Sequence, residues 1–217
     1  MNITKNSFAM LILMMSAAII FLFFRTDSRK PIDVDCSDYM ETNSDFFGIL
    51  EIRDLLLEPV VQGQDNSYYL SHGFSKSEDR NGCLFVDEAY SENCMNLVIY
   101  GHNSFNGTGF SNLIKFKDPD FIQSHPEISL TSSDGTCSVF RIAMILNYST
   151  GDIVTCDPYQ TQLPPDHLSR CRRYARYYID ENVRLDSSSR ILTLSTCDET
   201  VYGSEGRLII VAIREDC

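Results

Sequence analysis

Three short strings place residues capable of thiol chemistry at the ends of apolar runs. Leu97-Val-Ile-Tyr-Gly-His-Asn103 closes one run with a histidine, and Ile191-Leu-Thr-Leu-Ser-Thr-Cys197 closes another with a cysteine. Gly206-Arg207 opens the last apolar run, with the arginine ten residues after the cysteine. A thiolate is the reactive form of cysteine, and a neighbouring imidazole can hold or generate it. Attack on a carbonyl builds an oxyanion that needs a positive donor, which a guanidinium supplies. These residues predict a cysteine nucleophile that acts on a carbonyl.

Each of the three residues also has a structural explanation when it is taken alone. A cysteine at the end of a strand is more often a small buried apolar residue than a nucleophile. A histidine after Tyr-Gly is usually a turn residue, and Arg207 could simply flank a strand. The histidine precedes the cysteine in the chain, which differs from the order in papain-like proteases. Residue types alone therefore leave both readings open.

The strings taken together resemble the signature of a sortase, the bacterial cell-wall transpeptidase. The matching residues are Tyr100-Gly-His-Asn103, Thr193-Leu-Ser-Thr-Cys197 and Arg207. The resemblance runs from about Tyr39 to the C-terminus, so it covers the whole domain that follows the N-terminal apolar run.

Further segments resemble the class B branch of this family. Thr193-Leu-Ser-Thr-Cys197 resembles the class B form of the cysteine strand, and residues 60–70 and 82–87 resemble its N-terminal segments. A helix is expected over residues 166–183, where apolar positions fall at helical spacing. That helix resembles the one that class B inserts between barrel strands six and seven, and we expect its arginine face to be solvated.

The resemblance implies a role for each residue of the three strings. Cys197 is expected to be the nucleophile, His102 the general acid/base, and Arg207 the group that positions the scissile carbonyl. The thiolate would cleave a sorting pentapeptide between Thr and Gly or Asn and form a thioester. An amine of a peptidoglycan precursor or of a pilin would then resolve that thioester. No cofactor and no metal are expected.

Other residues match positions that line the class B substrate groove, although they could equally be strand and loop scaffolding. These residues are Asn66, Leu70, Ser195, Thr196 and Asp198. Asp198 or Glu199 could also serve as the carboxylate of a triad, but the family is read as Cys-His-Arg. The remaining histidines, at positions 72, 125 and 167, match no motif and are expected at the surface.

The fold is expected to be mainly β. Short runs rich in β-branched and aromatic residues, separated by turn residues, predict a barrel or a sandwich. The resemblance narrows this to a sortase-like closed barrel of about eight strands, with a short N-terminal helix over 39–47 and one long inserted helix before the cysteine strand. The expected strands are residues 48–52, 58–61, 83–86, 97–100, 137–146, 191–195 and 208–213.

The first 24 residues contain one charged side chain, Lys5, and residues 8–24 form an apolar run. Seventeen residues just suffice to span a bilayer. Because bulky Phe23-Phe24-Arg25 follows instead of small residues, we favour an uncleaved anchor over a signal peptide. The expected organisation is a cytoplasmic segment 1–7, a transmembrane signal-anchor 8–24, a linker 25–38 and a catalytic domain 39–217. A positive-inside count would put the domain in the cytoplasm. The resemblance instead implies a single-pass protein of the cell membrane with an extracellular domain.

Charge and cysteine content exclude some function classes. The net charge of −12 argues against a nucleic-acid partner. The eight cysteines contain no C-x2-C pair, so the usual zinc spacing is absent, and their disulfide pattern stays open. The expected partners are surface proteins with a C-terminal sorting motif, an acceptor amine and the membrane. A secreted cysteine hydrolase and a non-catalytic membrane-anchored adhesin remain as alternatives.

Overall fold

The computed structural model describes residues 35–104, 107–150, 166–182, 184 and 188–215. The chain separates into two units, residues 1–33 and 34–217, and the described residues all belong to the second. The expected segments 1–7 and 8–24 lie outside the described residues. Within the described residues, no helix has the length and apolar character needed to cross a bilayer.

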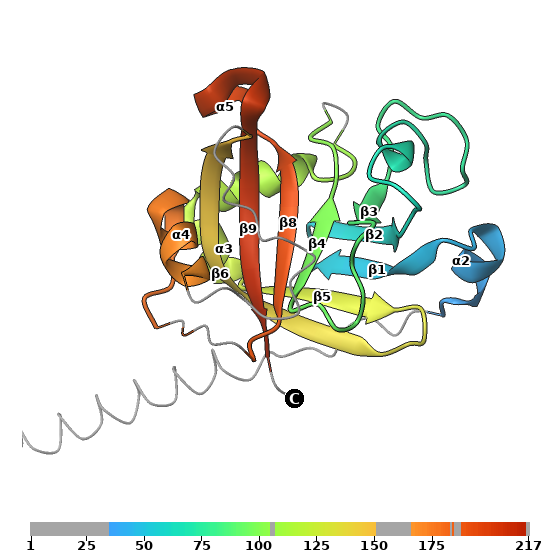
Figure 1. Cartoon of the computed structure of the whole chain (residues 1–217), viewed down its shortest axis with the longest axis horizontal. Helices are drawn as coiled ribbons and strands as arrows, with labels where there is room; N and C mark the ends of the chain where they lie inside the picture. The colour runs from blue at the N-terminus through green and yellow to red at the C-terminus, as the bar shows by residue number, and fades with distance from the viewer. Residues whose placement is uncertain (1–34, 105–106, 151–165, 183, 185–187, 216–217) are drawn as a thin grey trace, which may run out of the picture. The chain divides into compact units, whose positions relative to one another are not determined.

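One sheet of the described residues contains nine strands, in the order β5-β1-β2-β3-β4-β8-β9-β6-β7 (Figure 1). The pairing of β5 with β6 closes eight of them into a barrel and leaves β7 as an addition on β6. The expected mainly β fold is thereby confirmed. The strands are β1 Phe46–Ile52, β2 Leu56–Val61, β3 Leu84–Val86, β4 Asn96–Tyr100, β5 Glu127–Ser132, β6 Cys137–Ser149, β7 Ala175–Ile179, β8 Ile191–Cys197 and β9 Gly206–Arg214.

The helices of the described residues are short. They are α2 Ser37–Thr42, α3 Pro119–Ser124, α4 His167–Tyr174 and α5 Glu199–Tyr202, with 3₁₀ turns η1 Tyr68–Leu70, η2 Ser111–Lys117 and η3 Gly203–Glu205. The N-terminal helix exists but ends before the predicted residue 47, because Phe46 already begins β1. The backbone of Asn43 is extended at this point. The side-chain amide of Asn43 donates to the Phe74 carbonyl and to the Tyr69 hydroxyl, and these bonds fix the turn that leads into the sheet.

The prediction of one long helix over 166–183 is correct only for its first half. Helix α4 ends at Tyr174, and the chain continues directly as strand β7. Strand β5 pairs with residues 137–141 of β6, and β7 pairs along residues 144–146. Buried backbone groups need partners, and β7 supplies them to this part of β6. Because tyrosine and isoleucine also favour strands, the apolar spacing of this segment fitted both structures.

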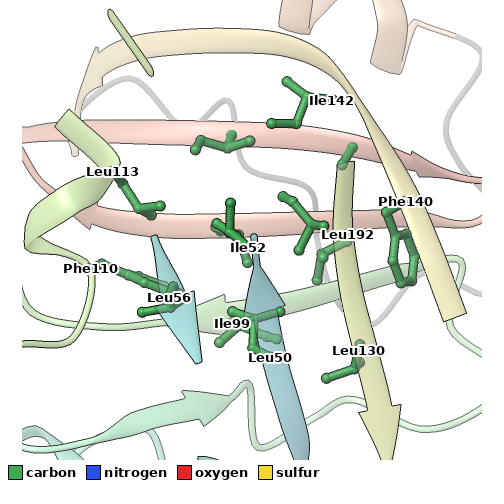
Figure 2. Packing of buried hydrophobic residues seen from close by; sticks show 14 of the residues in the cluster. Leu50, Ile52, Leu56, Ile99, Phe110, Leu113, Leu130, Phe140, Ile142 and Leu192 are labelled. Atoms are coloured by element: carbon green, nitrogen blue, oxygen red, sulfur yellow. The ribbon is translucent and has the colours of Figure 1, made fainter. Parts of the chain in front are cut away.

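Alternation along β8 and β9 gives each strand an inner and an outer face. Leu192 and Leu194 of β8, with Leu208 and Ile210 of β9, belong to the barrel core. Figure 2 shows Leu192 among the labelled side chains that converge there from several strands. The neighbouring positions instead pack outside the barrel against Cys171 of α4 and include Ile191, Ile209 and Val211. Since side chains alternate along a strand, Cys197 and Arg207 continue the outer face, and Thr196 and Asp198 the inner face.

The glycine before His102 is required by packing. A β-carbon at Gly101 would lie against the side chains of Leu84 and Phe110, which are themselves buried core residues. The strand β4 can therefore run close to the core at the point where it delivers the histidine.

Replacing Gly101 with alanine should destabilise the fold by about 1–3 kcal/mol, the usual cost of forcing an extra methyl group into a packed core. Chemical denaturation of the variant would measure this loss. Gly73→Ala is the matched control, because a β-carbon there meets only ordinary van der Waals contacts. Equal stability of the two variants would contradict the packing argument.

Candidate active site

Strands β8 and β9 bring Cys197 and Arg207 side by side. They are partners in the antiparallel register, at the end where α5 and η3 connect the two strands (Figure 1). Both residues are partly exposed on the outer face of the pair. The Arg207 Nη1 donates to the carbonyls of Ser204 at 3.1 Å and Gly206 at 2.9 Å. These two bonds hold one side of the guanidinium and leave its other nitrogens for a further acceptor.

Strand β4 runs parallel to β8 and delivers His102 to the same end. The Gly101 amide donates to the Ser195 carbonyl at 3.2 Å, and the Thr196 hydroxyl donates to the Gly101 carbonyl at 2.8 Å. Beyond the histidine, Asn103 Nδ2 donates to the carbonyl of Cys197 itself at 3.1 Å. The residues before and after His102, Gly101 and Asn103, are therefore both hydrogen-bonded to β8.

The His102 ring contacts the 3₁₀ turn η1. Its Nε2 lies 2.9 Å from the Leu70 carbonyl oxygen. Because a carbonyl can only accept, Nε2 carries the hydrogen in this bond. In the neutral ring, Nδ1 is then the nitrogen with a free lone pair. Leu70 is 41% exposed, so an apolar residue stands at the surface beside the histidine.

Asn66 is joined to the same region through Asp87. The Asn66 amide donates to Asp87 Oδ2 at 3.1 Å, and the Tyr100 hydroxyl donates to the same oxygen at 2.9 Å. The Asn66 carbonyl oxygen accepts from the Glu88 amide. Asn66 therefore has a fixed position relative to the end of β4.

Asp198 lies on the inner face and is only 1% exposed. Its carboxylate accepts from Asn147 Nδ2 at 2.6 Å and from the Thr200 hydroxyl at 2.7 Å, and it forms an ion pair with Lys117 at 2.7 Å. Burial alone would raise the pKa of Asp198. The bonds from Lys117 and Thr200 outweigh burial, so its pKa lies below the usual value. The Asp198 carboxylate is therefore ionised and bound at neutral pH.

The thiols in the described residues differ in environment. Cys197 is a free, partly exposed cysteine at the end of its strand. Burial first, with the nearby charges of Glu58 and Asp79, raises the pKa of the Cys83 thiol to about 12. A thiol with such a pKa is almost entirely protonated at neutral pH. Within the described part of the chain, no group of three or more His, Cys, Asp or Glu side chains is arranged to hold a metal ion.

A family model described as a sortase domain matches residues 56–215. The chain belongs to the sortase family. It is 32% identical over 195 residues to sortase B of Listeria monocytogenes, a match that covers 85% of this chain and 76% of that protein. It is also 28% identical to sortase B of Staphylococcus aureus, over 78% of this chain and 70% of the relative. The crystal structure of sortase B from Clostridium perfringens superposes with a TM-score of 0.74 at 27% identity and covers 84% of this chain and 100% of that chain.

These relatives confirm the class B resemblance that the sequence strings indicated. Membership makes the protein an enzyme, a cysteine transpeptidase of the bacterial cell surface. The class B structures also share its mainly β barrel.

The structure of this sortase brings some predicted residues together and separates others. His102, Cys197 and Arg207 meet at one end of the barrel, with Leu70 against the histidine. Ser195 follows the outer face, whereas Thr196 and Asp198 lie on the inner face. His72 and His125 are half-buried and stack on Tyr68 and Phe121, each with ring centroids 4.0 Å apart. The side chain of His167 lies outside the described residues.

Sequence reasoning missed three residues that fasten this sortase site. Asn103 directly follows His102 in the matching string Tyr100-Gly-His-Asn103, so the sequence could have indicated a role for it in the site. Lys117 and Asn147 had none, because each meets Asp198 only through the fold.

Proposed function

We propose that this sortase uses Cys197 as its nucleophile, His102 as its general acid/base and Arg207 to hold the scissile carbonyl. The observation that carries the proposal is the register pairing of Cys197 with Arg207 on the outer face, beside the strand end that delivers His102. An acyl group on the cysteine sulfur would then lie next to the guanidinium.

His102 transfers the proton in both half-reactions. Its Nε2–H bond to the Leu70 carbonyl fixes the ring, and the same carbonyl stabilises the ring when it is positively charged. We assign proton transfer to Nδ1. This nitrogen takes the proton of the Cys197 thiol as the thiolate is generated and passes it to the leaving amine as the thioester forms. When the thioester is resolved, it accepts the proton of the incoming amine and returns it to the departing Cys197 sulfur.

Arg207 stabilises the oxyanion that forms on the attacked carbonyl. The backbone N–H of Asp198 is already bonded to the Gly206 carbonyl at 2.9 Å and is not available to the oxyanion, whereas the guanidinium beside the thiol has nitrogens left to donate. Two carbonyls fix Nη1 and thereby orient the remaining nitrogens of the planar group.

The substrate lies over the outer face, against Asn66, Leu70 and Ser195. Leu70 offers an exposed apolar contact beside His102, and Ser195, although only 8% exposed, shares a face with Cys197. Thr196 and Asp198 point inward, which favours the scaffolding alternative for these two residues.

The remaining parts of the proposal concern location and partners. The substrates are surface proteins with a C-terminal sorting pentapeptide, cleaved between Thr and Gly or Asn, and the acceptor is an amine of a peptidoglycan precursor or pilin. The apolar run 8–24 is a single-pass anchor that leaves the catalytic domain outside the cell. Its length and the bulky residues after it support this part of the proposal.

Replacing Cys197 with alanine should abolish thioester formation, whereas alanine at each of the other seven cysteines should preserve it. The test is cleavage of a panel of sorting pentapeptides by the full chain in detergent, with and without amine acceptors, followed by mass spectrometry of the acyl-enzyme. Product joined to the amine supports transpeptidation. Release only to water supports the hydrolase alternative, and full activity of Cys197→Ala rejects the assigned nucleophile.

Arg207→Lys should lose at least about tenfold in kcat/KM, nearly as much as Arg207→Ala, because removal of one oxyanion donor typically costs about 10²–10³ in rate. Lysine keeps the charge but lacks the planar fork of donors. Steady-state cleavage and thermal melts of the three proteins measure the effect. A lysine variant within about twofold of wild type would reject the directional role, and equal losses of melting temperature and activity would indicate a folding role.

Protease added outside intact cells should digest the catalytic domain if residues 8–24 anchor it in the proposed orientation. Fractionation should place the full chain with the membrane and a chain starting at Pro31 in the soluble fraction. A domain that resists external protease until the cells are lysed would overturn the proposed orientation and support the positive-inside count.

A further inference from the structure

A charged cluster centred on the buried side chains of Asp198 and Asn147 lies on the inner face behind the proposed catalytic residues, with Lys117 half-buried and Thr200 exposed at its edge. It consists of Asp198, Lys117, Asn147 and Thr200 and is called here the inner cluster. Asp198 and Asn147 are 1% and 2% exposed, and the Lys117 side chain is 19% exposed. The buried charge of the Asp198 carboxylate is costly unless it is paired and hydrogen-bonded. Loss of its partners would therefore destabilise the local structure.

The ammonium of Lys117 is nearly saturated by this cluster. Its Nζ contacts Asp198 Oδ2 at 2.7 Å and the Thr200 hydroxyl at 2.8 Å, and it lies 5.3 Å from the centroid of the Tyr177 ring. Lysine has three N–H donors; two of them have oxygen partners in the cluster, and the Tyr177 ring adds a cation–π contact. Lys117 is the last residue of η2, which begins directly after Phe110. The Phe110 amide in turn donates to the His102 carbonyl.

Asp198 and Asn147 connect the inner cluster to β8 and β9, the strands that carry Cys197 and Arg207. Asp198 directly follows Cys197, and its second oxygen caps α5 by accepting from the Thr200 amide and hydroxyl. Asn147 Nδ2 bonds both to Asp198 and to the backbone carbonyl of Arg207, at 2.6 and 3.3 Å. The inner cluster therefore contacts the chain at three points of the site. Asp198 follows Cys197, Asn147 bonds to the backbone of Arg207, and Lys117 ends the turn η2 that begins after Phe110.

We propose that Lys117 and Asp198 are positioning residues, whose buried ion pair holds Cys197 and Arg207 in register for the acyl-transfer reaction. The inference rests on the proposed roles of Cys197 and Arg207. Asp198 acts through its neighbours and does not serve as a triad carboxylate. Alternation turns its side chain to the face opposite Cys197, and both of its oxygens are already bound.

The first test measures positioning without any substrate. Lys117→Met leaves the Asp198 charge buried without its cation. Amide hydrogen exchange of the full chain in detergent should then speed up by at least about tenfold across residues 197–207 and hardly change in β1 and β2. Arg141→Met is the matched control, because it breaks the exposed Arg141–Glu215 ion pair. Unchanged exchange at 197–207 in Lys117→Met would overturn the proposal.

The second test separates positioning from chemistry. For the best pentapeptide, Lys117→Met and Asp198→Asn should each lower kcat by at least about tenfold at a temperature where both are folded, with KM within about twofold. The double variant should lose little more than either single variant, because the two residues act as one unit. Lys117→Arg should recover most of the rate. Alkylation of Cys197 by iodoacetamide should stay within about threefold of wild type, because it needs neither Arg207 nor an oriented carbonyl.

The contrary results are distinct. Loss of activity and of alkylation in Asp198→Asn, with Lys117→Met fully active, would make Asp198 a catalytic carboxylate and reject the proposal. A kcat of Lys117→Met within about twofold of wild type would also reject it. If Asp198→Asn does not fold, the Lys117 variants decide. If the wild type forms no thioester with any peptide, the proposed function fails, and the exchange experiment still decides whether the ion pair fixes residues 197–207.

Discussion

The pairing of β8 with β9 is the constraint on which the site depends. It places residues ten positions apart in the chain directly opposite each other, and the strict alternation of strands decides which side chains share a face. Residues 197 and 207 fall on one face, and residues 196 and 198 on the other. The side chains of the proposed catalytic residues therefore stand on the outside of the barrel, while the neighbouring Thr196 and Asp198 hold the strand ends from within.

The site is assembled mainly by main-chain groups. The histidine ring bonds to a carbonyl of η1, the guanidinium bonds to two carbonyls of the β8–β9 connection, and the cysteine carbonyl receives the amide of Asn103. Carbonyl groups cannot be altered by substitution of their own side chains. The geometry of the site thus depends on loop conformation as well as on the side chains of the inner cluster.

The sequence predicted those parts of the structure that are encoded locally. Seven strands were visible as apolar runs, and the three strings that end or begin such runs indicated the family. Strand β5 was missed because it has only Ile128 and Leu130 at its alternating inward positions, among polar neighbours. The helix over 166–183 was half wrong because its apolar spacing also suited a strand, and the open part of β6 decided between them. The inner cluster had no local signal, since Asn147 and Asp198 lie 51 residues apart. Only closure of the barrel brings such residues together.

Strand β7 affects how readily the edge of the sheet can pair with a second molecule. Without it, residues 144–146 of β6 would present unpaired peptide groups beside strand β5, a ready template for a second molecule. β7 pairs with this stretch and becomes the outermost strand of the sheet among the described residues. It is only five residues long and carries an exposed arginine at position 176. Short, charged borders resist edge-to-edge association, so the segment that replaces the second half of the expected helix also protects the barrel against self-aggregation.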